Sequence, residues 1–267
     1  MNISLNKYYR NYHQNYKSSS QITRVITEKW FDDNMYCPFC SSSEIKAFSN
    51  NYPVADFYCN SCKEVFQLKA KKNSIGEKVL DGEYNTMIKA IKSNSAPNFF
   101  FLAYAKDFYS INSLIIVPKE FILPNIIQKR KPLSIKARRA GWTGCNILLD
   151  GISNQGKIYA IKEQKIIDKS EVINNVLSIG FLRKIKNTES RGWINDMLLI
   201  IAEIKSNVFK LEDVYKFSCL LKKLHPNNNN IEAKIRQQLQ ILRDHGIIEF
   251  LGKGVYKKND KEEEMSP

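Results

Sequence analysis

The chain has 267 residues, 43% of them hydrophobic, which is enough for one large core or two smaller ones. Its formal net charge of +14 points to a polyanionic partner, most often nucleic acid, although a merely basic soluble protein has the same composition. The longest apolar runs, near residues 99–105 and 197–202, are much shorter than a membrane-spanning helix requires, so we expect no membrane contact.

The N-terminal segment predicts a polar arm followed by a helix. Residues 1–20 are polar and end in three serines, which is typical of a mobile arm or a helix cap. From residue 21 onwards, apolar side chains recur at helical spacing, at Ile22, Val25, Ile26 and Trp30. Glu28 lies on this helix. We favour a solvated surface glutamate there over the alternative, an acid that assists a metal ion.

Two Cys-x-x-Cys pairs, Cys37 with Cys40 and Cys59 with Cys62, follow this helix. Their separation is typical of a four-cysteine zinc ribbon, in which four thiolates hold a structural zinc ion and leave no position open for water. Two unrelated redox or surface pairs are the alternative. We favour zinc because nothing at the start of the chain resembles a secretory signal, so disulfides are not expected.

Residues 51–72 predict a β-hairpin around the second cysteine pair. Strand-forming residues flank the CNSC turn: Val54, Phe57 and Tyr58 before it, and Val65, Phe66 and Leu68 after it. The hairpin carries Asp56 and, on the return strand, Gln67 and Lys69, which share one face because side chains alternate along a strand. Two oxygen ligands for a divalent cation beside an ammonium form a variant of the proline-aspartate…(Asp/Glu)-x-Lys nuclease signature.

The next hundred residues predict a mixed α/β domain. We expect a helix at 81–94, strands at 98–104 and 113–117, and a short helix or turn at 119–128. The continuous apolar run of the first of these strands favours a central strand covered on both faces. We also expect two strand-like pieces at 157–163 and 172–182. The order helix, hairpin, helix, strand, strand suits a mixed sheet flanked by helices.

Residues 129–146 form a basic segment that Pro132 and the glycines at 141 and 144 keep irregular. Its candidate DNA-binding residues are Arg138, Arg139 and Trp142, with Arg130 and Lys136 nearby. Such a loop can cover phosphates and stack on or cage a base. Taken alone, the residues equally allow Trp142 as a core anchor with the arginines as a solvated rim.

The C-terminal part predicts a winged helix after a polar linker. Helices are expected at 194–204, 211–224 and 231–244, followed by a hairpin with a lysine at its tip. The third helix presents Arg and Gln side chains outward, and such side chains can contact bases and phosphates in a major groove. We therefore favour a DNA-binding winged helix over one that contacts another protein. The candidate DNA-binding residues here are Lys234, Arg236, Gln237, Gln240, Arg243 and Lys253.

Three blocks of sequence resemble one known family. They are PVADFYCNSC…LKAKK at 53–72, RKPLSIKARRAGWTGCNI at 130–147 and KIRQQLQILRDHGIIEF at 234–250. Together they closely resemble the DpnI-like, methyl-directed restriction endonucleases of the Dam-replacing family, in the same order and over nearly the whole chain.

The resemblance implies a PD-(D/E)xK catalytic domain at 1–185 with a zinc ribbon at 37–62, a linker at 186–192, a winged-helix domain at 193–258 and a disordered tail at 259–267. It further implies a monomer in the bacterial cytoplasm that cuts duplex DNA within GATC sites containing N6-methyladenine. Its cofactors would be a structural zinc and a catalytic magnesium, and both domains would read the methylated sequence.

One position departs from the family pattern. This chain has Gln67 at the position where the family has a metal-binding acid. The catalytic set is therefore Asp56, Gln67 and Lys69, with Asp56 and Gln67 as magnesium ligands. One negative charge fewer should weaken magnesium binding. Three interpretations stay open: an enzyme with a weaker site, a methyl-dependent DNA-binding protein or regulator, and a deliberate inactivating change. An unrelated zinc-ribbon transcription factor would leave Asp56 and Lys69 without a role.

Overall fold

The computed structural model describes residues 1–49, 55–105 and 110–259. The chain divides into a first unit, Met1–Thr188, and a second unit, Glu189–Pro267, which are described separately below. Val54, expected in the hairpin, lies outside the described residues, as does all of the expected tail except Asn259. Within the described parts, no helix is both long and apolar enough to cross a membrane.

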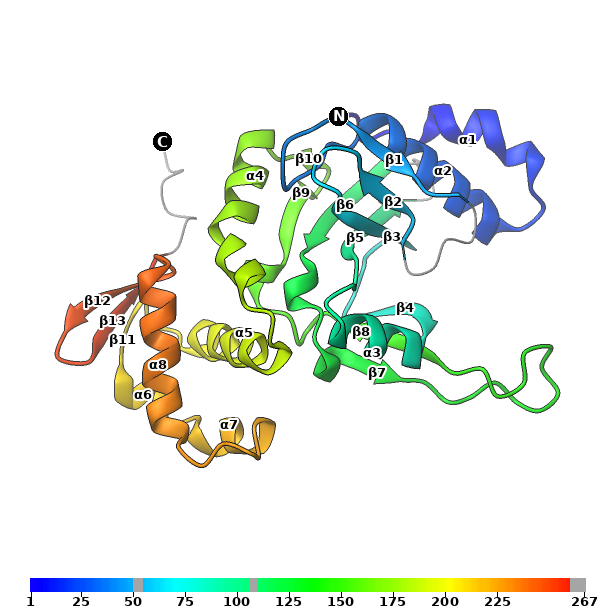
Figure 1. Ribbon diagram of the computed structural model, residues 1–267. Coiled ribbons are helices and arrows are strands. Elements are labelled where there is room, and N and C mark those ends of the chain that lie inside the picture. The colour runs from blue at the N-terminus through cyan, green and yellow to red at the C-terminus, as the bar shows by residue number, and fades with distance from the viewer. Residues whose placement is uncertain (50–54, 106–109, 260–267) are drawn as a thin grey trace. The chain divides into compact units, whose positions relative to one another are not determined.

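A seven-stranded mixed sheet forms the centre of the first unit (Figure 1). Its order is β1 (Ile45–Ala47), β2 (Phe57–Cys59), β3 (Val65–Lys72), β5 (Asn98–Ala105), β6 (Ser110–Val117), β9 (Ile158–Lys162) and β10 (Lys165–Ile166). Only β3 and β5 pair in parallel; the other neighbours are antiparallel. Residues 98–104 are all buried, so the predicted central strand is confirmed.

Helices cover this sheet. The N-terminal helix α1 (Asn6–Tyr12) and the 3-10 turn η1 (His13–Asn15) precede α2 (Ser19–Asn34), which packs against β1 and β3, while α4 (Lys169–Ser178) packs against β9. Ile26 and Trp30 of α2 are buried, as its apolar spacing predicts. Short 3-10 turns fill the expected helix-or-turn segment at η2 (Lys119–Phe121) and η3 (Pro124–Ile126), and a third lies at η4 (Asn154–Gly156).

A second, three-stranded sheet has the order β4 (Lys78–Glu83), β8 (Gly144–Leu148) and β7 (Ile127–Lys129). The helix α3 (Tyr84–Lys92) starts directly after β4, because the Glu83 side chain accepts hydrogen bonds from the N–H groups of Asn85 and Thr86. The basic segment joins β7 to β8 and runs out from this small sheet (Figure 1).

The predicted strand at 172–182 is wrong. This segment forms α4 and the 3-10 turn η5 (Gly180–Lys184). Val172 and Val176 are buried four residues apart on one helical face, and the Asp168 side chain caps the helix by accepting from the N–H of Ser170. These β-branched residues therefore lie in a helix, because tertiary packing overrides their weak strand preference.

The second unit contains α5 (Thr188–Glu203), β11 (Val208–Lys210), α6 (Leu211–Tyr215), α7 (Ser218–Leu224), α8 (Ile231–Asp244), β12 (Ile248–Gly252) and β13 (Val255–Lys258). Its sheet has the order β11-β13-β12. Two details differ from expectation: α5 already includes residues 188–192, expected in the linker, and the helix expected at 211–224 is divided into α6 and α7.

The helix α8 buries one apolar face, as its periodicity predicts. Ile235, Leu239 and Leu242 are fully buried. The hairpin of β12 and β13 turns at Lys253, which has a φ of +50°. Lys253 lies between two glycines that also have positive φ. Helices followed by such a hairpin form a helix-turn-helix unit with a wing.

Candidate active site

The predicted hairpin is confirmed by the pairing of β2 with β3. Phe57 lies opposite Phe66 in an antiparallel register. The backbone N–H of Asp56 donates to the carbonyl of Phe66 at 2.9 Å. The side-chain Oδ2 of Asp56 accepts from the N–H of Leu68 at 2.8 Å. These bonds fix the Asp56 carboxylate beside the strand that carries Gln67 and Lys69.

Gln67 presents an oxygen that suits a cation. Its Oε1 atom is buried and accepts no hydrogen bond from the described residues. A buried amide oxygen without a hydrogen bond destabilises the fold, unless a ligand binds to it. Carboxylate and amide oxygens are ligands that magnesium accepts. Asp56 and Gln67 thus each offer an oxygen of the type that magnesium binds.

Electrostatics set Asp56 and Glu28 apart from ordinary surface acids. Burial raises the pKa of Asp56; the Leu68 N–H and the charges of Lys69 and Arg24 oppose this rise, and Asp81 adds to it. Burial also raises the pKa of Glu28, and the Asp56 carboxylate raises it further against the opposing charge of Arg24.

Glu28 of α2 is partly exposed. Only 34% of its side chain is exposed, where it also contacts Arg24 at 3.7 Å. Glu28 lines the same cleft as Lys69, and its role, solvated glutamate or metal-assisting acid, stays a prediction.

Asp81, on β4, is the site residue that sequence reasoning missed. Its Oδ1 lies 2.5 Å from the Nζ of Lys69, and its side chain is 1% exposed. The burial alternation of β4 places Asp81 on the same inward face as Val79, while Leu80 points outward. The helix expected at 81–94 begins only at Tyr84, and residues 81–83 belong to β4. Had this strand been predicted, an acid at an inward position of it would have indicated Asp81.

A cleft of about 720 Å³ opens beside Lys69. It lies between α2 and the strands β3 and β4, and Glu28 also lines it. Four further basic residues line it, namely Arg24, Lys71, Lys72 and Lys78. A positively charged cleft beside the candidate catalytic lysine suits a phosphate backbone.

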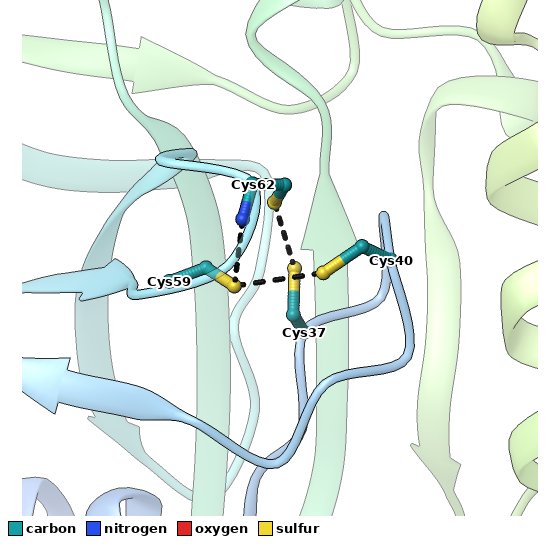
Figure 2. A group of neighbouring side chains, drawn as sticks. All are labelled: Cys37, Cys40, Cys59 and Cys62. Carbon is teal, nitrogen blue, oxygen red and sulfur yellow. Dashed lines mark hydrogen bonds between the residues drawn. The ribbon is translucent and has the colours of Figure 1, made fainter.

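The four cysteines of the predicted ribbon converge on one point. Figure 2 shows Cys37 and Cys40 on one loop and Cys59 and Cys62 on a second, with their sulfur atoms directed towards each other. All four sulfurs lie within 4.8 Å of one another, and two Sγ–Sγ distances are 3.5 Å. Sulfurs around tetrahedral zinc lie about 3.8 Å apart. The geometry fits a structural zinc site, and no other cluster of three or more potential metal ligands occurs among the described residues.

In the basic segment between β7 and β8, neighbouring residues hold Trp142 in place. The Arg139 guanidinium lies over the Trp142 ring at 4.7 Å. Trp142 is half-buried, and a Cβ atom at Gly144 would lie 2.8 Å from its ring, so glycine is needed there. Arg138 and Arg139 are exposed. Trp142 is thus neither a fully buried core anchor nor a free surface residue.

The outward face of α8 carries the predicted polar residues. Arg236, Gln237, Gln240 and Arg243 are exposed, as is Lys253 in the wing. The Lys234 ammonium donates to Gln237 Oε1 at 2.8 Å, and Arg236 donates to the Tyr215 hydroxyl at 2.5 Å. Such bonds orient long side chains for contact with a groove.

These observations define a class: a mixed α/β unit with a candidate hydrolytic hairpin and a four-cysteine cluster, followed by a helix-turn-helix unit. Residues 1–185 match the family model described as the Dam-replacing family, and residues 189–258 match the model of the Dam-replacing helix-turn-helix domain. The chain therefore belongs to the Dam-replacing family, and the resemblance seen in the sequence is confirmed. Family membership indicates a DNA-binding restriction endonuclease.

Proposed function

We propose that this protein is a methyl-directed restriction endonuclease that hydrolyses duplex DNA at GATC sites containing N6-methyladenine. One observation carries the proposal: in a chain matched to the family over both units, Asp56, Gln67 and Lys69 lie on one hairpin. The Gln67 oxygen has no partner among the described residues, which supports a site that is able to take a cation despite the missing acid.

Three side chains have distinct roles in this mechanism. Asp56 and Gln67 would hold magnesium, which when bound supplies Lewis-acid stabilisation and an activated water. The Lys69 ammonium orients the attacking water and stabilises the negative charge that develops on the phosphoryl oxygens. Asp56 is held in place by the Leu68 N–H, so it needs little rearrangement. The products are a 5′ phosphate and a 3′ hydroxyl.

The methyl group is read by apolar surface of matching shape. Trp142 offers the largest aromatic face of the basic segment, and Arg139 fixes that ring at 4.7 Å. The outward residues of α8 offer the second set of base contacts, led by Gln237 and Gln240. We propose that both units read the site, with the protein acting as a cytoplasmic monomer.

The proposal is tested with two plasmids, one carrying N6-methyladenine at GATC and one unmethylated. The purified protein with magnesium is expected to cut only the methylated plasmid. Equal cutting of both would refute the methyl requirement.

A second candidate function is favoured by Gln67 itself. The missing negative charge weakens a magnesium site, so a protein that binds methylated DNA without cutting it is the alternative. Methyl-selective retardation in a gel-shift assay, together with no cleavage, would support this second function. Cleavage that appears after Gln67→Glu would then assign the loss to this position.

A further inference from the structure

The strand β4 carries a buried carboxylate that stability does not explain. Asp81 has a side-chain exposure of 1%, and its Oδ2 accepts no hydrogen bond from the described residues. Among the residues that the structure describes, its ion pair is the one between Oδ1 and Lys69. Buried ion pairs are frequently no more stable than apolar residues of similar size, because desolvation offsets their attraction. The pair is therefore better explained by the chemistry of the site in which it lies.

The local backbone directs Asp81 towards the hairpin. β4 pairs with β8, and the register shifts by a bulge between Asp81 and Glu83. Asp81 itself follows the regular alternation of β4, and bulges occur preferentially next to active sites. The contact of Asp81 with Lys69 crosses from the small sheet to the seven-stranded sheet, so the acid reaches the motif from a separate element.

The charges of the site make this acid significant. Asp56 and Lys69 carry opposite charges and Gln67 is neutral, so these three residues sum to zero. An ammonium next to a metal-binding carboxylate opposes cation binding. When Asp81 is included, the residues carry a net charge of one negative unit. A site with aspartate, glutamate and lysine carries the same net charge. Asp81 also affects Asp56 electrostatically, so the two carboxylates share one environment.

We propose that Asp81 is a further carboxylate of the candidate active site, and that its ion pair with Lys69 compensates for the acid missing at Gln67. This inference rests on the proposed function, since it assumes a cation at Asp56 and Gln67. Asp81 acts as a positioning residue: it holds the lysine and offsets its charge, so that the charge of Asp56 remains available to the cation.

The test measures the affinity of the zinc-loaded protein for Mn²⁺ by electron paramagnetic resonance, without DNA. Asp81→Asn removes the charge at constant size and is expected to weaken Mn²⁺ binding by at least about tenfold. Glu77→Gln, an exposed acid shortly before β4, is the matched control and should leave binding within about threefold. The double variant Gln67→Glu with Asp81→Asn moves the charge back to the family position and should recover wild-type affinity within about threefold.

The recovery separates a charge role from a structural one, because restoring an acid at 67 does not repair a damaged fold. Unchanged Mn²⁺ binding in a folded Asp81→Asn protein would overturn the proposal, and so would a double variant that stays as weak as Asp81→Asn. If Asp81→Asn does not fold, Asp81→Ser replaces it; failure of both to fold would assign Asp81 to stability alone and also overturn the proposal.

These outcomes are distinguishable from failure of the proposed function. Wild-type protein that cuts methylated DNA while Asp81→Asn binds Mn²⁺ normally keeps the nuclease and rejects the role of Asp81. Wild-type protein that binds no Mn²⁺ and does not cut rejects the metal chemistry of the nuclease, and the role of Asp81 with it.

Discussion

The Nζ atom of Lys69 lies 2.5 Å from Oδ1 of Asp81, and this ion pair joins β3 of the seven-stranded sheet to β4 of the small sheet. The two strands also line the cleft beside α2. With 21% of its side chain exposed, Lys69 can contact both the buried acid and a phosphate in the cleft. The lysine is thereby held at the site before any substrate arrives.

Lys69→Ala should abolish cleavage and leave DNA binding largely intact. The ammonium acts on the charge of the transition state, and loss of one such group costs about 10²–10³ in rate. Single-turnover cleavage of methylated duplex and a gel-shift assay measure the two effects. Lys92→Ala, at the exposed end of α3, is a control with the same charge change. Cutting retained by Lys69→Ala would refute the catalytic role.

Loss of the zinc site should unfold the first unit. Cys59→Ser removes a buried ligand close to Asp56 on the hairpin, and a structural zinc contributes its binding free energy directly to folding. We expect a large fall in the thermal midpoint of the first unit and loss of bound zinc. Cys219→Ser, an exposed cysteine of α7, is the control and should retain both. A Cys59→Ser protein as stable as wild type would contradict the structural role.

Glu64 should make the first unit sensitive to acid. It accepts hydrogen bonds from Asn98 and Lys119, both at 2.9 Å, and pairs with Arg183. Burial raises the pKa of this carboxyl, but the attraction of Lys119, the Asn98 hydrogen bond and Arg183 outweigh burial and hold the pKa below its usual value. A lowered folded-state pKa means that this stabilisation is complete above about pH 4.3, the usual value for glutamate, and is lost as pH falls through the folded pKa.

Glu64→Gln should therefore cost about 1–3 kcal/mol at neutral pH and progressively less below about pH 4. Urea unfolding of the wild type, Glu64→Gln and the exposed-acid control Glu77→Gln across this range measures the difference. A cost that stays constant with pH would show that the charge of Glu64 is not what stabilises the fold.

Trp142→Ala should reduce discrimination between methylated and unmethylated DNA. The ring is held by Arg139 and lies over Gly144, so it presents a fixed apolar face. Loss of an aromatic contact with a base costs about 1–3 kcal/mol. Trp142→Phe keeps an aromatic face and serves as the control. Competition binding with the two duplexes gives the ratio; an unchanged ratio in Trp142→Ala would place methyl recognition elsewhere.

Local patterns in the sequence predicted most of the fold. The apolar run at 98–104, the periodicity of α8 and the glycines around Lys253 each determine local structure without help from distant residues. The segment at 172–182 was misassigned because an apolar, β-branched run of that length fits either a strand or a buried helix. Its burial against β9, a non-local fact, decides between them.

The candidate site was predictable where its residues are close in the chain. Asp56, Gln67 and Lys69 lie on one hairpin, and the cysteine spacing indicates a shared metal. Asp81 reaches Lys69 from β4, and Glu28 lines the neighbouring cleft from α2; only tertiary packing brings them there. Residue 81 was expected in a helix but lies on β4, so neither the strand of Asp81 nor its partner was predicted.

The most direct test of a working nuclease site with glutamine at position 67 is cleavage of a short duplex that contains one methylated GATC. The wild-type protein with magnesium is expected to cut it and to leave the same duplex without the methyl group intact. Absence of cleavage by wild type, with cleavage restored by Gln67→Glu, would contradict this account and show that the protein in its present form binds methylated DNA without cutting it.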